Sequence, residues 1–333
     1  MVESNRVKAE AYMDPGKESG WKKLLGPSFK ERALTGIIKV DRVAGKSAAT
    51  RTFAKYPLKF LIPSKIAASG VDVVWIYAIS YGGGIVSNDS ITQRVEVLPS
   101  CSAVITTQAS TKIYKSVKGK MCEQILQAYV GREGLLAVLP DPITCFKDSK
   151  YMQVQEFYLA AESNLVLIDW MTSGRIDNGE SWEFGLYKST NHIYLQDEKL
   201  DQSTPLFLDC LCLEQGVGIS VADRMQGFHV IANMVIYGPK LAAFRAQVQK
   251  NVQALTQTAF TRRKSADFTA HLRNSRSSCT EPLLFVSCST IGLLDEGLVV
   301  RAVASTTEVV YDFFRAQLAY IVSEIGACPY ASR

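Results

Sequence analysis

The sequence predicts a mostly β protein with about two helices toward its C-terminal half. From about residue 35, short runs of β-branched and aromatic residues recur, separated by Gly, Pro, Asn and Asp. Two later segments instead repeat apolar residues every three or four positions, as helices do. The 333 residues are 47% hydrophobic and 21% charged, an ordinary globular composition that is long enough to bury a full core.

The predicted strands follow one another with no helical pattern between them. The clearest are Thr35–Val43, Val71–Ser80, Ile91–Val97, Ala103–Thr107, Tyr151–Tyr158, Leu165–Trp170, Ser181–Tyr187, His192–Gln196 and Phe207–Leu213. This order argues against Rossmann and TIM-type folds and favours a large antiparallel β structure. No fixed internal period is visible, so a propeller or other regular repeat is not predicted.

The two helices are expected near residues 241–256 and 308–325. Their apolar stripes are Leu241, Phe244, Val248, Val252 and Leu255 in the first, and Val310, Phe313, Phe314, Leu318, Ile321 and Ile325 in the second. Pro239 precedes the first and Gly326 ends the second, as is typical of helix boundaries. The simplest interpretation is that both stripes face the core, and a face for docking a partner is the alternative.

We expect one large domain over residues 34–330, preceded by a polar leader at residues 1–33 that is poorly ordered. No apolar segment resembles a secretory signal, and no apolar run approaches the roughly 18 residues of a membrane helix. The sequence therefore predicts a cytoplasmic protein without a membrane partner. Its eight cysteines are then expected to be free thiols.

Motifs that carry chemistry are few. Cys210 and Cys212 share a strand face; they are either half of a soft metal site or, as we favour, two buried thiols. The three histidines lack the spacing of a zinc protease, and we interpret His192 and His229 as core residues. The basic residues Arg262, Arg263, Lys264, Arg273 and Arg276 are interpreted as a solvated loop, and no nucleic-acid partner is predicted.

The glycine run at residues 82–84 is not a phosphate-binding loop. It lacks the following Lys and Ser/Thr, and it leads into a strand rather than a helix. We interpret it as a turn between strands that Asn88 and Asp89 close. No combination of nucleophile, base and orienting group is visible, so the sequence does not predict a conventional enzyme.

Four segments in order resemble the urease accessory protein UreD family, which is also called UreH. They are Gly83–Asp89, Ala103–Lys115, Leu139–Phe146 and Asp169–Gly185. The first is similar to the family's Gly-Gly-Ile-Val-Gly-Gly-Asp, with Ser87 and Asn88 in place of its second pair of glycines. The residues that carry the motif in the first and last segments are Gly83, Gly84, Gly174, Arg175, Gly179 and Gly185.

The resemblance implies an elongated, layered, β-helix-like scaffold with a few helices and no catalytic activity. It implies a helical UreF-like partner, a UreG-like GTPase that binds through that partner, and apo-urease as the target. It also implies that Ni²⁺ passes through an internal tunnel during GTP-dependent assembly of the urease metallocentre. Nickel is then a cargo in transit, and no permanent cofactor is expected.

The resemblance points to acids for the nickel path. Asp89 and Asp169 match family positions, and Asp209 and Glu180 are the further candidates. A turn hydrogen bond is the favoured alternative for Asp89. For Asp169, an ion pair with Arg175 or a turn hydrogen bond is equally open, whereas Glu180 is expected to form a buried pair with Arg175.

Two other functions remain open at this stage. One is an all-β hydrolase that uses a carboxylate pair such as Asp169 and Glu180, which would have to face an open cleft at a defined separation. The other is a pure interaction scaffold with no metal path. Whether the acids line an enclosed passage or an open groove distinguishes the hydrolase from the conduit.

Overall fold

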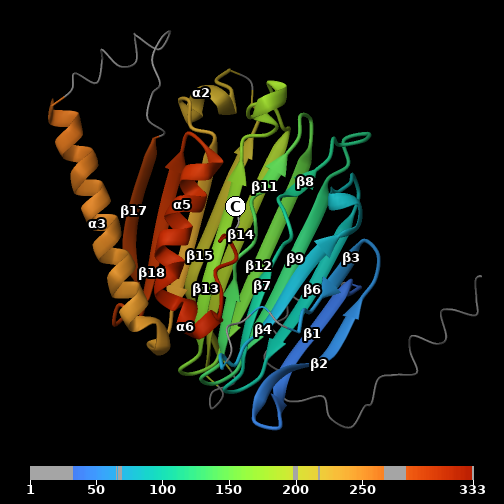
Figure 1. Cartoon of the computed structure of the whole chain (residues 1–333). Helices are drawn as coiled ribbons and strands as arrows, with labels where there is room; N and C mark the ends of the chain where they lie inside the picture. Colours follow the sequence, from blue (N-terminus) through green and yellow to red (C-terminus); the bar gives the residue numbers. More distant parts are fainter. Residues whose placement is uncertain are drawn as a thin grey trace, which may run out of the picture.

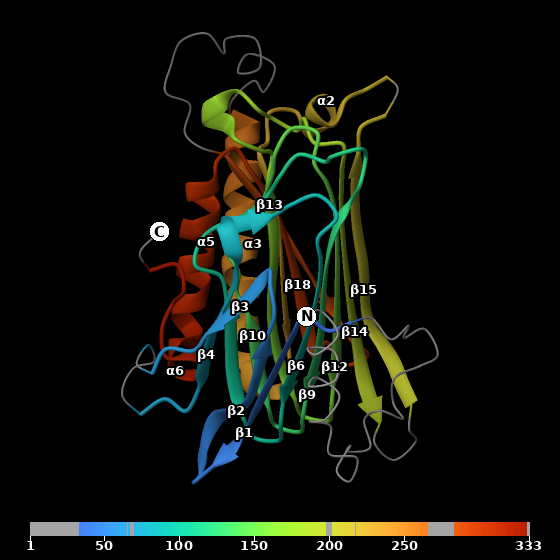
Figure 2. The same ribbon diagram turned by 90° about the vertical axis from the view of Figure 1, so that its right-hand side faces the viewer.

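The computed structural model describes residues 33–331, apart from residues 65, 67–69, 198–201, 217 and 266–282. Two large β sheets stack face to face, and helices cover the outer face of one of them (Figures 1 and 2). The predicted mostly β, layered and β-helix-like fold is confirmed. The predicted leader lies outside the described residues up to residue 32.

The sheets are named here sheet A and sheet B. Sheet A has the strand order β15 (Gln202–Glu214), β14 (Leu186–Asp197), β12 (Lys150–Leu159), β9 (Cys122–Val130), β6 (Ser90–Val97), β1 (Gly36–Val43) and β2 (Lys46–Ala54). Sheet B has the order β17 (Leu284–Ile291), β18 (Gly297–Ala304), β16 (Val230–Tyr237), β13 (Asn164–Thr172), β10 (Leu135–Val138), β7 (Ser102–Thr106), β4 (Val74–Ser80) and β3 (Leu58–Leu61). The short strands β5 (Gly84–Ile85), β8 (Thr111–Ile113) and β11 (Ile143–Cys145) extend sheet B beside β13.

The central strands are parallel, so the predicted antiparallel arrangement is wrong for the middle of the molecule. In sheet A, β1, β6, β9, β12 and β14 run parallel, and in sheet B, β4, β7, β10 and β13 do. The chain passes from β6 to β7, from β9 to β10 and from β12 to β13, so each crossover is a strand of the other sheet. Parallel pairs need a crossover, and strands supply it here in place of helices.

These stacked coils are unequal in length, which explains why the sequence shows no period. Successive sheet A strands begin at Ser90, Cys122, Lys150 and Leu186.

The strand predicted over residues 181–187 is mostly wrong. Only its last two residues belong to β14, because Trp182 has a left-handed backbone (φ 59°) at a corner.

Among the described residues, the helical layer packs on the outer face of sheet B (Figure 2). The α-helices are α2 (Val221–Met225), α3 (Ala242–Ser265), α5 (Thr307–Leu318) and α6 (Val322–Ile325); the 3-10 turns are η2 (Tyr81–Gly83), η3 (Ile176–Asn178), η4 (Pro239–Leu241) and η5 (Ala319–Ile321). Both predicted helices are present, although 3-10 turn η5 interrupts the second. In the described part of the chain, no helix is long and apolar enough to cross a membrane.

Helix α3 continues through Ser265, beyond the predicted end of the first helix. The interpretation of the basic cluster as a loop is therefore wrong for Arg262, Arg263 and Lys264, whose backbone is helical. Arg273 and Arg276 lie outside the described residues.

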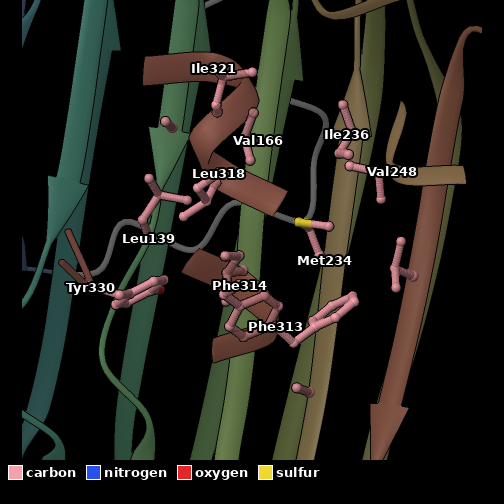
Figure 3. Packing of buried hydrophobic residues seen from close by; sticks show 14 of the residues in the cluster. Leu139, Val166, Met234, Ile236, Val248, Phe313, Phe314, Leu318, Ile321 and Tyr330 are labelled. Atoms are coloured by element: carbon pink, nitrogen blue, oxygen red, sulfur yellow. The ribbon is translucent and has the colours of Figure 1, made fainter. Parts of the chain in front are cut away.

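The predicted apolar stripes of the helices face the core except at Leu255, which is 42% exposed, so the prediction is wrong for that residue. Phe313, Phe314 and Leu318 of α5 pack on sheet B, as Figure 3 shows. The ring of Trp170 on β13 meets the ring of Phe314 edge-on, with centroids 5.5 Å apart. Burial of such side chains contributes roughly 1.5–3 kcal/mol each, so this layer anchors the helices to the sheet.

Two further apolar clusters fill the space between the sheets. One includes Leu165, Leu167 and Phe157, and the other includes Met171 and Tyr151. On β12 and β13 the two clusters therefore occupy opposite ends of the same strands. The inward positions between them are polar.

Candidate functional site

Polar side chains cross the space between the sheets midway along the strands. We call this set the polar belt: Gln93, Gln124, Gln153, Gln155, Ser189, Asn191 and Asp209 from sheet A, and Asp169, Asn233, Ser287 and Arg301 from sheet B. It separates the two apolar clusters. A buried polar group costs free energy unless it is hydrogen-bonded, so a layer of them inside a β core is a costly feature.

Strand register aligns the polar belt across the strands. In sheet B, Asp169 is opposite Asn233, Asn233 is opposite Arg301, and Arg301 is opposite Ser287. In sheet A, Gln155 is opposite Asn191, and Asn191 is opposite Asp209. The polar belt therefore runs perpendicular to the strands, toward the edge where β15 and β17 lie.

Asp169 lies at the centre of the polar belt with only 7% of its surface exposed. Its Oδ1 accepts a hydrogen bond from Gln153 Nε2 (3.0 Å), and its Oδ2 accepts from Ser189 Oγ and Asn191 Nδ2 (2.7 Å each). These donors are neutral. Burial raises the pKa of Asp169, and the three hydrogen bonds oppose that rise.

A cavity of about 70 Å³ lies between the sheets on one side of Asp169. Gln93, Gln124, Gln155 and Thr106 line it together with a second buried carboxylate, Asp141. The volume exceeds the roughly 10–15 Å³ that one water needs. The cavity therefore has both the room and the polar lining to hold water.

Asp141 connects this cavity to the helical layer. Its Oδ1 accepts a hydrogen bond from the hydroxyl of Tyr311 on α5 (2.8 Å), and its Oδ2 accepts from Thr107 Oγ1 (3.2 Å). The carboxylate is 2% exposed. Asp141 is thus the one buried carboxylate, within the described residues, that bonds to a helix side chain and also lines the cavity.

An open groove of about 350 Å³ lies on the other side of Asp169, between β15 and strands β16–β18. Asp209, Asn233, Ser287 and Arg301 line it. Arg301 donates a hydrogen bond from NH2 to Asp209 Oδ1 at 2.9 Å. The side chain of Arg301 is 51% exposed and that of Asp209 is 21% exposed, so this ion pair faces solvent.

The charges of Asp169 and Asp209 influence each other. Asn191 donates to Asp169 and stands opposite Asp209 on the neighbouring strand. The negative charge of Asp209 adds to burial in raising the pKa of Asp169. The polar belt therefore extends from the cavity, past Asp169, to the groove.

Comparison with known proteins identifies the family. A family model described as "UreD urease accessory protein" matches residues 35–333. The chain belongs to the UreD family of urease accessory proteins. It is 48% identical over 297 residues to urease accessory protein D of Arabidopsis thaliana, covering 89% of this chain and 99% of that protein.

More distant UreD proteins are similar over most of their length too. Urease accessory protein D of Oryza sativa subsp. indica is 45% identical over 298 residues, which is 90% of this chain and 95% of that protein. UreD of Anaeromyxobacter sp. is 32% identical over 305 residues, which is 92% of this chain and 91% of that protein. The resemblance found from four sequence segments is therefore confirmed.

In this UreD chain, Asp89 closes a turn and lies outside the polar belt. Its backbone N–H donates to Val86 O at 3.0 Å, and its Oδ2 accepts from Val86 N at 3.1 Å. Asn88 takes a left-handed conformation (φ 73°) in place of the family glycine, which asparagine tolerates. The turn hydrogen bond that we favoured for Asp89 is present.

Glu180 also lies apart from the polar belt, at the corner before β14. Arg175 donates to it from Nε at 2.9 Å and from NH2, and the guanidinium stacks 4.2 Å above the ring of Phe146. These bonds lower the pKa of Glu180. The predicted pair is present, but it is not buried, because Arg175 is 41% exposed. The ion pair between Arg175 and Asp169 is not formed, because Arg175 bonds to Glu180 and Asp169 accepts from Gln153, Ser189 and Asn191.

The motif glycines of the UreD family shape these two corners. Gly84 permits a close approach, since a Cβ there would lie 2.4 Å from Lys112 O. Gly179 (φ 77°) ends the turn that starts at Arg175, in a conformation that favours glycine. Gly83 belongs to the same turn region as Gly84, and Gly174 and Gly185 flank the Arg175 corner.

Cys210, Cys212 and His229 were also interpreted from the sequence. Cys210 and Cys212 are free thiols, as expected, but both are exposed because β15 is the edge strand of sheet A. The prediction that they are buried is wrong. His229 is half-buried, Ser173 and Ser181 contact its Nδ1 at 3.1 Å, and burial lowers its pKa.

Sequence reasoning found the two belt acids but missed their neighbours. Gln153, Gln155, Asn191 and Asn233 line the same layer as Asp169. Polar residues at alternating positions of a strand were the available signal, and Gln153 with Gln155 shows it. Among the described residues, no three His, Cys, Asp or Glu side chains group closely enough to hold a metal ion.

Proposed function

We propose that this urease accessory protein docks on apo-urease and supports GTP-dependent nickel delivery, passing Ni²⁺ between its two sheets along the polar belt. Its partners in this proposal are a UreF-like helical protein, a UreG-like GTPase bound through it, and apo-urease. The protein acts in the cytoplasm and is not an enzyme. Ni²⁺ is its cargo, and it keeps no permanent cofactor.

The observation that carries the proposal is the continuity of the polar belt. It joins the cavity beside Asp169 to the groove beside Asp209, and in the described part of the chain it lies between two apolar clusters. A scaffold alone needs no such layer, because apolar residues would stabilise the two sheets at lower cost. Such departures from ordinary packing are expected at functional sites.

The ligand types of the polar belt suit an ion in transit. Its side chains offer carboxylate, amide and hydroxyl oxygens, and the free cysteine Cys210 also lines the groove. Among the described residues, no three His, Cys, Asp or Glu side chains form a cage there. Nickel binds nitrogen and sulfur ligands tightly, so cages of Cys and His would retain it. Isolated oxygen ligands and water attract the ion and still release it, as conduction requires.

Nothing favours the hydrolase alternative. Asp169 lines the cavity between the sheets, whereas Glu180 is absent from that lining and pairs with Arg175 at a separate corner. A carboxylate-pair hydrolase needs both groups beside one open cleft. The remaining rival is a scaffold without a metal path, and the following experiment separates the two.

The test is urease activity after co-expression of apo-urease, its cognate UreF-like and UreG-like proteins and this chain, with nickel present. We expect Asp169→Ala with Asp209→Ala to cause a large loss of activation while the complex still co-purifies. A second pair, Asp169→Asn with Asp209→Asn, keeps the side-chain shapes and removes the charges. It guards against a loss that is due only to misfolding.

The matched control removes two carboxylates outside the polar belt. Glu156 points to the outer face of sheet A, and Asp312 on α5 is 71% exposed. We expect Glu156→Ala with Asp312→Ala to activate urease normally. If both double variants of Asp169 and Asp209 still activate urease, the proposed nickel conduit is wrong and the scaffold without a metal path is favoured.

A variant with an apolar side chain in the cavity lining tests the proposed nickel path without removing a charge. Gln155 lines the cavity and donates from Nε2 to Asn191 Oδ1 at 2.9 Å. Gln155→Leu replaces an amide by an apolar group of similar volume, and we expect reduced activation with intact assembly. Normal activation by this variant would place the nickel route elsewhere.

A further inference from the structure

The ion pair at the groove has an unusual position. Asp209 belongs to β15 of sheet A and Arg301 to β18 of sheet B, so their 2.9 Å contact spans the groove from one sheet to the other. Both side chains line the groove, together with Asn233 and Ser287. The guanidinium therefore sits beside the belt carboxylate that lies nearest to solvent.

The pair is readily opened. Arg301 is 51% exposed, and exposed ion pairs contribute little stability because water solvates both partners. A guanidinium carries one positive charge, whereas a divalent ion carries two and competes for the same Oδ1 of Asp209. Displacing Arg301 would also leave its guanidinium in solvent, where it needs no protein partner.

The neighbouring groups supply what a divalent ion needs after that exchange. Asn233, whose side chain carries an amide oxygen, and Ser287, whose side chain carries a hydroxyl oxygen, line the same groove, and about 350 Å³ leaves room for retained water. Oxygen ligands and water suit divalent ions that remain partly hydrated. Without Arg301, the same carboxylate would hold such an ion with no competitor.

We propose that Arg301 is a tethered cation which occupies Asp209 when no metal is present and competes with a divalent ion at the mouth of the polar belt. This rests on the proposed function, since it concerns release of the cargo at the groove. Arg301 keeps the binding of the ion weak enough for it to leave, as a conduit requires. It is a positioning residue for the carboxylate and not a ligand.

The test is equilibrium dialysis of radioactive Ni²⁺ against the purified full-length chain. We expect Arg301→Gln, which removes the charge at similar length, to bind Ni²⁺ about two- to fivefold more tightly than the wild type. Arg301→Lys keeps a cation and should remain close to the wild type. The gain should disappear in Arg301→Gln with Asp209→Asn.

Each other result overturns the proposal. Unchanged or weaker binding by Arg301→Gln means that Arg301 only links the sheets, and thermal unfolding then reports its structural role. A gain that persists in the double variant places the bound ion away from Asp209. Dialysis needs no urease, so a failure here is distinct from retained urease activation in the Asp169/Asp209 pairs, which overturns the conduit itself.

Discussion

Strand β13 is buried along its whole length, yet its two faces differ. Val166, Ile168 and Trp170 face the helices in a continuous apolar layer. On the opposite face, Asp169 interrupts an otherwise apolar row and meets hydrogen-bond donors from sheet A. The same strand therefore contributes to an ordinary core on one side and to the polar belt on the other.

This difference separates stability from function. The helical layer follows the usual rule for cores, in which apolar burial drives folding. The polar belt departs from that rule, and its hydrogen bonds only offset the cost of burying polar groups. Substitutions in the helical layer should therefore act mainly on the free energy of unfolding, whereas those in the polar belt should act mainly on urease activation.

The largest effect on stability is expected for Phe314→Ala. Phe314 is 1% exposed and packs against Trp170 and Tyr330. Loss of its ring should lower the free energy of unfolding by about 3–5 kcal/mol, because the cavity left behind collapses only in part. Denaturant unfolding followed by tryptophan fluorescence and circular dichroism measures the change.

A matched control for that substitution is Phe53→Ala on β2, where the ring is 45% exposed. We expect a change within about 0.5 kcal/mol, as for most surface substitutions. If the two variants unfold alike, the layer between α5 and sheet B does not carry the stability assigned to it here.

A smaller effect, with a distinctive pH dependence, is expected for Asp169→Asn. The folded-state pKa of Asp169 is raised above the ordinary carboxyl value of 3.8, so the folded protein binds more protons than the unfolded chain above that pH. The contribution of Asp169 to stability is thus present at low pH and is lost as pH rises through its folded pKa. The asparagine variant should lack this decline.

Urea unfolding of the wild type and Asp169→Asn between pH 4 and pH 7.5 measures the difference. The stability of the wild type relative to the variant should fall as pH rises. The opposite slope would mean that the three donors, Gln153, Ser189 and Asn191, stabilise the ionised carboxylate more than burial penalises it.

The sequence predicted those elements that a local pattern determines. The helices were visible because Phe313, Phe314 and Leu318 recur at helical spacing on one side, and this side does face sheet B. Asp169 was a candidate because it matches a position of the family motif, and its burial beside an apolar run then requires hydrogen-bond partners. The Arg175–Glu180 pair was predicted from complementary charges close in sequence.

The rest depends on which strands become neighbours. The parallel order of β6, β9, β12 and β14 arises from strand crossovers through sheet B, and no local pattern marks them. On β12 the inward Gln153 and Gln155 are polar and the outward Met152 and Val154 are apolar, the reverse of an ordinary core strand. The alternation was therefore visible in the sequence, but it did not show which face lies inward. Likewise, Cys210 is exposed because it lies on the outward face of β15, which is an edge strand.

The smallest effect is expected for Glu180→Gln. Arg175 holds the pKa of Glu180 below its ordinary value of 4.5, so the contribution of Glu180 to stability is present above that pH and is lost as pH falls through its folded pKa. This slope is opposite to that of Asp169. Because Arg175 is 41% exposed, we expect a fall in Tm of at most about 2 °C at neutral pH.

Urease activation by Glu180→Gln should equal that of the wild type, because Glu180 stabilises a corner outside the polar belt. Thermal unfolding and the co-expression assay measure the two quantities on the same preparation. Reduced activation with unchanged Tm would return Glu180 to the nickel path and extend that path beyond the polar belt to the Arg175 corner.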